Sequence, residues 1–262
     1  MLLHLVADYG VGDLAFAEVR QRLAALLPDV PVVATPVPPL DSLSAGFVIG
    51  QLAGGEAAPE RVVYHNVAPR QDDDQPREGN EGEALLAARL RSGVLVVGPG
   101  SRHVLSFVRE ELESLHRVEV PPSTSQFRSR DAFPSVVAEL ARGGRGPLAE
   151  AVPIDSVEPV PDRRVVYVDG YGNLKTSWSG APAAVGTRVD VRVGDTLASA
   201  VVGDGTFAVP AGEISFAPGS SSWRAGGEVV TGFELLRRGG SAAALFDGAR
   251  AGDPVDVTTA EK

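Results

Sequence analysis

Residues 2–13 read LLHLVADYGVGD, and this stretch decides the fold expected for the first half of the chain. The six residues from Leu2 to Ala7 are mostly apolar and predict a buried strand. A polar, glycine-containing turn follows, and Leu14–Leu27 then shows helical spacing. Strand, turn and helix in this order are typical of an α/β sheet, which binds ligands at the carboxyl ends of its strands. Asp8 lies at such an end, whereas Asp13 is placed to cap the helix.

The same alternation continues through the first third of the chain. Val30–Ala34 and Arg61–Asn66 read as strands, and residues 42–52 between them read as a helix capped by Asp41 or Ser42. Alternating strands and helices predict an α/β domain with a largely parallel sheet. Further elements of this domain are predicted at Glu83–Leu90 and Val94–Val97, as paired strands, and at Ser101–Leu115 and Phe133–Arg142, as helices.

The pattern changes after residue 146. Residues 143–161 are rich in glycine, proline and acidic side chains, which predicts a linker at 147–161 between an N-terminal domain, residues 1–146, and a C-terminal domain, residues 162–262. Short β-like runs separated by turn signals fill the second domain and predict a small antiparallel barrel or sandwich. These runs are Arg163–Asp169, Lys175–Trp178, Arg188–Val193, Leu197–Val202, Glu213–Ala217, Glu228–Leu236 and Pro254–Val257.

Composition restricts the class of ligand. The 262 residues are 44% hydrophobic, enough to bury a core in each of two domains. A net charge of −10 argues against a nucleic-acid or anionic-membrane partner and leaves small molecules. The absence of cysteine excludes disulfides, thiolate metal sites and cysteine nucleophiles. Because Met1–Asp8 has no basic region and only a short apolar run, we expect a cytoplasmic protein without a membrane span.

A second stretch, VDGYGNLKTS at residues 168–177, concentrates hydrogen-bonding groups at the end of a predicted strand. The Asn173 side chain carries both a donor and an acceptor, so it can pair with the edge of a purine. The Asp169 carboxylate can hold a ribose diol or an ammonium group, and Tyr171 lies between the two. The alternative interpretation is a Gly-Asn turn that closes a β-hairpin.

The order Asp-x-Tyr-Gly-Asn-Leu-x-Thr resembles the Asp-x-Phe-Gly-Asn-x-x-Thr-Asn signature of the S-adenosylmethionine (SAM) hydroxide adenosyltransferases, a family that also holds SAM-dependent fluorinases and chlorinases. The resemblance is collinear from Asp8 to about Val257. In that family an Asp-x-Gly-x-x-Asp turn holds the ribose hydroxyls with its first aspartate and faces methionine with its second. A glycine-rich segment near the end of the chain meets adenine. The resemblance therefore implies these ligand-binding residues: Asp8, Asp13, Phe127, Asp169, Tyr171, Asn173, Gly239 and Gly240.

The residues implied to border the nucleophile are Arg77, Arg128 and Ser129. The hydrolases of the family activate water with an aspartate, an arginine and a histidine. Here Ala68 replaces the aspartate and Arg128 the histidine, while Arg77 matches the arginine. Ser129 stands where the hydrolases have glycine and the fluorinases a halide-binding serine. Leu40 replaces a family aromatic beside the methionine chain.

The resemblance implies an N-terminal α/β domain, a C-terminal β-barrel and a homotrimer whose ligand lies between two subunits. The expected reaction is displacement at the ribose C5′ of SAM, with hydroxide giving adenosine and L-methionine. A halide would instead give a 5′-halogenated nucleoside. SAM is the substrate, and neither a metal nor a redox cofactor is needed.

Two other hypotheses remain. A non-catalytic nucleoside- or SAM-binding protein is favoured by Ala68 and Arg128. An unrelated α/β hydrolase has little support, because the sequence has no Gly-x-Ser-x-Gly, no HExxH and no phosphate-binding glycine loop. The acidic run Asp72–Asp74 is expected to be a solvated loop, with cation binding as its alternative.

Overall fold

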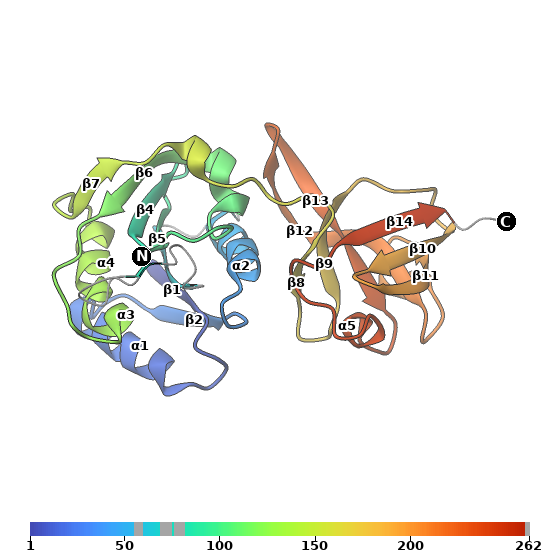
Figure 1. The fold of residues 1–262 in the computed structure, drawn as a ribbon, viewed down its shortest axis with the longest axis horizontal. Coiled ribbons are helices and arrows are strands. Elements are labelled where there is room, and N and C mark those ends of the chain that lie inside the picture. Colours follow the sequence, from blue (N-terminus) through green and yellow to red (C-terminus); the bar gives the residue numbers. More distant parts are fainter. Residues whose placement is uncertain (55–59, 69–74, 76–81, 260–262) are drawn as a thin grey trace. The chain divides into compact units, whose positions relative to one another are not determined.

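The computed structural model describes residues 1–54, 60–68, 75 and 82–259. The chain separates into two compact units, Met1–Pro159 and Val160–Lys262. Within the described residues, each unit is built on a seven-stranded mixed sheet (Figure 1). The structure therefore agrees with two successive sheet-based units, while the strand directions differ from the prediction in both.

The sheet of the first unit has the strand order β2-β1-β3-β5-β4-β6-β7. Its first four strands in that order are parallel, as predicted, and helices α1 and α2 form the crossovers from β1 to β2 and from β2 to β3. The other three pair antiparallel, so the sheet is mixed rather than largely parallel. The strands are β1 (Leu2–Ala7), β2 (Val32–Pro36), β3 (Arg61–Asn66), β4 (Leu85–Leu90), β5 (Leu95–Pro99), β6 (Leu112–Val118) and β7 (Leu148–Ala151).

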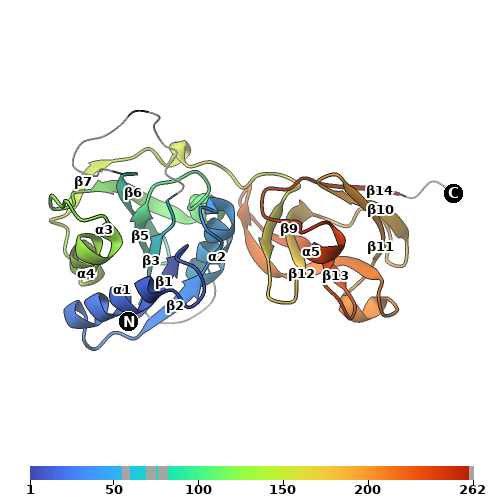
Figure 2. The same cartoon turned by 60° about the horizontal axis from the view of Figure 1, so that its bottom comes forward.

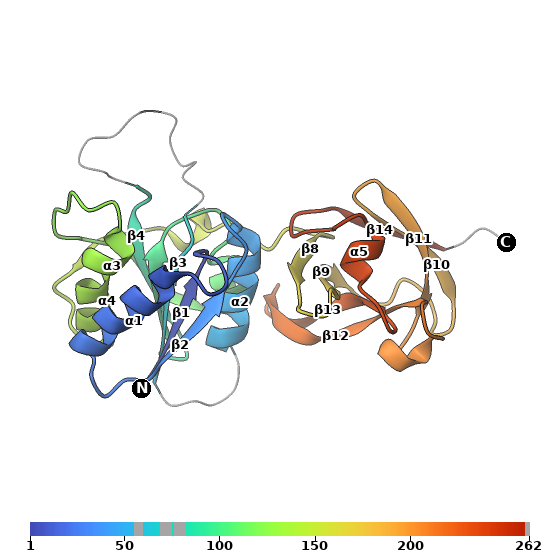
Figure 3. The ribbon, with the colours of Figure 1, turned by 90° about the horizontal axis from the view of Figure 1, so that it is seen from below.

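Helices cover both faces of this sheet. Helices α1 (Leu14–Leu26), α3 (Arg128–Asp131) and α4 (Phe133–Ala141) lie on one face, and α2 (Ser42–Gly54) lies on the other (Figure 3). The α1 side encloses an apolar core that includes Leu5, Leu23, Tyr64 and Val137. In the described part of the chain, no helix is long and apolar enough to cross a membrane.

The predicted helix over 101–115 is wrong. The segment contains only a short 3₁₀ helix, η2 (Ser106–Glu111), and Leu112 then begins strand β6. Pairing with β4, in which His116 lies opposite Ala87, satisfies the backbone and overrides the local helical spacing. The range predicted as a linker, 147–161, likewise contains strand β7, which pairs with β6 at the edge of the sheet.

The second unit is a curled sheet with the order β14-β10-β11-β12-β13-β9-β8, antiparallel except for the parallel pair β11–β12 (Figure 2). Backbone hydrogen bonds join its two edges: Val165 N donates to Asp253 O at 2.9 Å and Val255 N to Arg163 O at 2.9 Å. Helix α5 (Ala242–Leu245) adds Ala242 to the core. The strands are β8 (Val165–Val168), β9 (Leu174–Ser179), β10 (Arg188–Val193), β11 (Thr196–Val202), β12 (Ile214–Ala225), β13 (Glu228–Arg237) and β14 (Val255–Thr259).

Candidate functional site

Asp8 lies directly after β1, at the carboxyl edge of the parallel strands. Its Oδ2 accepts a hydrogen bond of 3.0 Å from Leu40 N, in the loop between β2 and α2. Its own backbone N donates to Asn66 O, at the end of β3, over 3.4 Å. Leu40 has a φ of 60°, a left-handed conformation that is strained for a residue with a side chain. Asp8 therefore ties three segments together where an α/β sheet binds ligands.

Asp13 accepts a hydrogen bond of 2.7 Å from Ala15 N and is the N-cap of α1. Asp41 caps α2 in the same way, through the backbone N–H groups of Leu43 and Ser44. Both aspartates thus have the structural role that their positions before a helix predict. Because the Asp13 Oδ1 atom accepts a hydrogen bond from the helix end, fewer acceptor positions of this carboxylate are left for a ligand.

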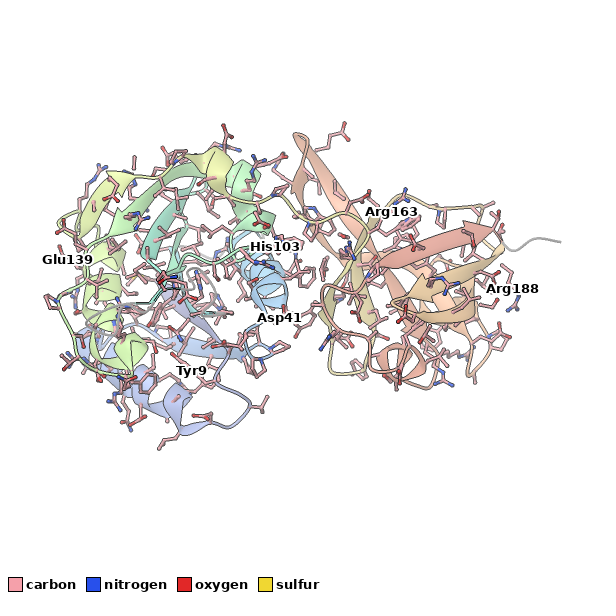
Figure 4. All side chains as sticks on the ribbon, in the orientation of Figure 1. Tyr9, Asp41, His103, Glu139, Arg163 and Arg188 are labelled. Atoms are coloured by element: carbon pink, nitrogen blue, oxygen red, sulfur yellow. The ribbon has the colours of Figure 1, made fainter. Side chains whose placement is uncertain are left out.

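Tyr9 joins the candidate site, although the sequence did not predict it. Its ring packs edge-on against Phe16 and Phe127, at centroid distances of 5.1 and 5.8 Å. Figure 4 labels Tyr9. Its hydroxyl donates to Ser129 Oγ at 2.7 Å, and the Tyr64 hydroxyl donates to Ser129 O at 2.7 Å. Burial raises the pKa of Tyr9 well above its ordinary value, so the group stays a neutral donor. The only sequence signal was its place beside Asp8.

The structure describes two of the three residues predicted to border the nucleophile, Arg128 and Ser129, and both are held by contacts with aromatic side chains. Ser129 is only 5% exposed, and its hydroxyl is held by Tyr9. The Arg128 guanidinium lies 4.9 Å from the centre of the Phe133 ring, a cation–π contact. Phe127 packs between Tyr9 and the guanidinium of Arg130, which lies 4.9 Å from its ring centre. Arg77 and the acidic run at 72–74 lie outside the described residues.

His65 lies fully buried near the carboxyl end of β3. Its ring occupies the space above Gly98, where an added Cβ would come within 2.4 Å of the ring atoms. Its Nδ1 has no hydrogen-bond partner among the described residues. Burial lowers the pKa of His65 to about 3, so the imidazole is neutral at ordinary pH.

The buried imidazole gives a pH-dependent contribution to stability. Between pH 6.5 and about 3 the unfolded chain binds a proton on His65 and the folded chain does not, so the unfolding free energy falls as pH falls. We expect the wild type to lose up to about 1.4 kcal/mol per pH unit more than His65→Leu in this window. Urea unfolding followed by circular dichroism at several pH values measures the difference. Equal slopes for the two proteins would contradict the prediction.

In the second unit, the Asp169 carboxylate organises the turn between β8 and β9. Its Oδ1 accepts from Tyr171 N at 2.9 Å and Asn173 N at 3.0 Å, and its Oδ2 accepts from Asn173 Nδ2 at 3.0 Å. The segment is therefore a hairpin turn, as the alternative interpretation held. The turn nevertheless presents polar and aromatic groups, since Tyr171 is 84% exposed.

The glycine-rich segment lies against this turn. Ala243 N donates to Gly172 O at 2.8 Å, and a Cβ on Gly172 would lie 2.1 Å from Ser241 Oγ. Only glycine fits at residue 172, which also has a φ of 78°. Gly239 and Gly240 directly precede Ser241, so two segments some seventy residues apart, both predicted to meet the nucleoside, are neighbours.

Apart from Asp13, which caps α1, the predicted residues that the structure describes thus form two clusters, one in each unit. The first-unit cluster comprises Asp8, Phe127, Arg128 and Ser129, to which the structure adds Tyr9. The second-unit cluster comprises Asp169, Tyr171, Asn173, Gly239 and Gly240.

No family model and no curated protein matches this sequence. Among the solved structures that match it, the following two do so over nearly the full length of both chains. An uncharacterized conserved protein from Thermotoga maritima is 20% identical, with a TM-score of 0.76 and coverage of 98% of this chain and 100% of that one. A conserved hypothetical protein from Thermus thermophilus is 24% identical, with a TM-score of 0.71 and coverage of 98% and 99%. The chain shares its fold with both proteins. At these identities the likeness extends to the fold alone.

Proposed function

We propose that the protein is a SAM-dependent adenosyltransferase that displaces methionine from the ribose C5′ of SAM, with water as the nucleophile. The observation that supports this most is the contact between the Asp169–Asn173 turn and the segment at 239–243. Both segments resemble adenosine-binding segments of one enzyme family, and they are neighbours in space. Asp8, at the carboxyl edge of the first sheet, supplies a carboxylate for the ribose hydroxyls.

The hydrogen-bonding capacity of the turn suits a purine. Asn173 uses one N–H of its amide on Asp169, which leaves the second N–H and the carbonyl oxygen for a base edge. Tyr171 is exposed beside it and offers an aromatic face. Since Asp169 fixes both backbone and side chain of the turn, these groups are preorganised.

In this reaction an oxygen–C5′ bond forms as the C5′–sulfur bond breaks, and the electron pair of the broken bond goes to sulfur. Methionine leaves as a neutral thioether, and the proton of the attacking water passes to solvent. Because the sulfonium is already a good leaving group, the protein mainly has to desolvate the nucleophile and align it opposite the sulfur. No step requires a metal or redox cofactor, so turnover should persist in EDTA.

The geometry around Ser129 favours a second candidate, a non-catalytic SAM- or adenosine-binding protein. The Ser129 hydroxyl is held by Tyr9, Arg128 lies on Phe133, and Ala68 stands where the family hydrolases carry an aspartate. An arginine cannot act as the general base, because it keeps its proton in proteins. Arg128 could still orient hydroxide or an anion. With a halide as nucleophile, the Ser129 hydroxyl would be the donor that the resemblance assigns to it.

Incubating the purified protein with SAM and separating the products by chromatography tests the proposal. Adenosine and methionine should form in equal amounts, whereas added chloride or fluoride would divert product to the 5′-halogenated nucleoside if a halide is the nucleophile. Saturable calorimetric binding of SAM without turnover would instead identify a binding protein. Neither turnover nor binding would refute both candidates.

We further propose a cytoplasmic homotrimer in which each ligand contacts the first-unit cluster of one subunit and the second-unit cluster of another. Equilibrium sedimentation measures the subunit number. If sites are shared, mixing the impaired Asp8→Asn and Asn173→Ala proteins under subunit exchange should raise the activity above that of either variant alone, because some sites then receive two intact clusters. No recovery despite exchange would place both clusters of a site in one chain.

A further inference from the structure

The first unit contains a pocket of about 340 Å³, and none of the predicted site residues that the structure describes lines it. It lies over the antiparallel part of the sheet, between the turn that follows β5 and the segment that follows β7. Its walls are mainly apolar and include Leu86 of β4, Leu115 of β6, Leu105, Val152 and Val157. This volume is at the lower end of the range for small-molecule sites, and all lining residues belong to the first unit.

Arg102 lines this pocket from the turn after β5. Its φ of 21° is unusual for a residue with a side chain. Backbone hydrogen bonds from Gly100 N to Ala84 O, at 2.8 Å, and from Val104 N to Ser101 O, at 3.0 Å, hold the turn. In the part of the chain that the structure describes, no carboxylate or carbonyl pairs with the Arg102 guanidinium. A strained, well-held turn thus presents an unpaired cation beside an apolar pocket.

Two other charged groups line the pocket and define the charge that it accepts. Arg117 is a second cation, although its Nε is paired with Glu150 at 3.0 Å. Among the described lining residues Glu158 is the one carboxylate, and its Oε2 lies 3.5 Å from Nε2 of His103 (Figure 4 labels His103). Burial lowers the pKa of His103. Arg102, whose charge no described group compensates, favours one negative charge in the ligand, while Glu158 and the apolar walls disfavour a second.

The chain as a whole repels anions, since it has a net charge of −10. An anion in this pocket therefore depends on the local arginines, and its carbon chain must contact the apolar walls. We propose that this pocket binds a small monocarboxylate with an apolar body, at a site separate from the adenosyl-transfer clusters. This inference does not depend on the proposed function.

Calorimetric titration of the full chain with octanoate tests the proposal, with octanol and octanedioate as matched probes. Octanol keeps the apolar body without the charge, and octanedioate adds a second carboxylate. Saturable octanoate binding is expected, with each matched probe binding about tenfold more weakly, the effect of losing one charge-assisted hydrogen bond or adding one repulsive charge. No saturable octanoate binding, or equal affinity for octanol, would overturn the proposal.

Substitutions of residues that line the pocket test whether octanoate binds there. Arg102→Gln should weaken octanoate binding about tenfold and leave octanol binding unchanged, whereas Arg20→Gln, an exposed arginine on α1, should change neither. Ala84→Leu should abolish binding of all three probes by filling the pocket. If Arg102→Gln binds octanoate as tightly as Arg20→Gln does, the pocket is not the site. That comparison remains decisive if Ala84→Leu fails to fold.

Discussion

The Asp8→Asn variant is expected to show a kcat/KM for SAM about 100-fold below that of the wild type. Asn keeps an acceptor for Leu40 N, so the loop that Asp8 holds should stay in place. The negative charge is lost, and with it the strength of two charge-assisted hydrogen bonds to the ribose hydroxyls. At about 1.5 kcal/mol for each bond the loss is roughly 3 kcal/mol, which corresponds to a hundredfold.

The matched control is Asp29→Asn, because Asp29 precedes β2 at the opposite, amino-terminal edge of the same sheet. It changes the net charge of the first unit identically and should leave kcat/KM within about twofold of the wild type. Initial rates of adenosine release at subsaturating SAM give both values. A rate for Asp8→Asn equal to that of Asp29→Asn would remove Asp8 from the site.

Much of the first unit was predictable from local pattern. Strand β1, the Asp13 cap and helix α1 follow from an apolar run, a capping residue and helical spacing that agree with one another. The segment 101–115 was not predictable, because its apolar spacing fits a helix while its pairing partner, β4, decides for a strand. Strand β7 was not predicted, because an edge strand of four residues in a Gly- and Pro-rich stretch has little local signal.

Part of the candidate site was also predictable from the sequence, and part was not. Motif order identified the Asp169–Asn173 turn and the segment at 239–243, and the structure brings these two together. Tyr9 was missed because an aromatic residue after a strand is normally core, and its contact with Ser129 spans 120 positions in the sequence. Ser129 was predicted to border the nucleophile, and the sequence could not show that its hydroxyl accepts a hydrogen bond from Tyr9.

A buried ion pair joins two neighbouring strands of the second sheet, close to the Asp169–Asn173 turn. Lys175 of β9 lies opposite Glu234 of β13, with Nζ 2.6 Å from Oε1 and side chains only 14% and 8% exposed. Ser220 N also donates to Glu234 Oε1, at 3.0 Å. A Cβ on Gly219 would lie 2.4 Å from the same oxygen, so the carboxylate is enclosed by backbone on that side. Glu234 consequently depends on Lys175 for charge compensation.

Lys175→Met is expected to lower the unfolding free energy of the second unit by about 3–5 kcal/mol, because it leaves a buried carboxylate without its cation. Urea unfolding followed by tryptophan fluorescence measures this unit specifically, since Trp178 and Trp223 are the two tryptophans of the chain. The double variant Lys175→Met/Glu234→Leu should recover most of the loss, because replacing both members of a buried pair by apolar groups is often nearly neutral.

An exposed pair in the same sheet provides the control. Arg188 Nη2 lies 3.1 Å from Glu213 Oε2, with side chains 56% and 38% exposed (Figure 4 labels Arg188). Arg188→Met should lower the unfolding free energy by less than about 1 kcal/mol, because solvent screens the pair and hydrates the Glu213 carboxylate when Arg188 is removed. The difference between the two Met variants isolates the effect of burial. If Lys175→Met costs no more than Arg188→Met, water or another group must compensate Glu234, and the enclosure described for its carboxylate is wrong.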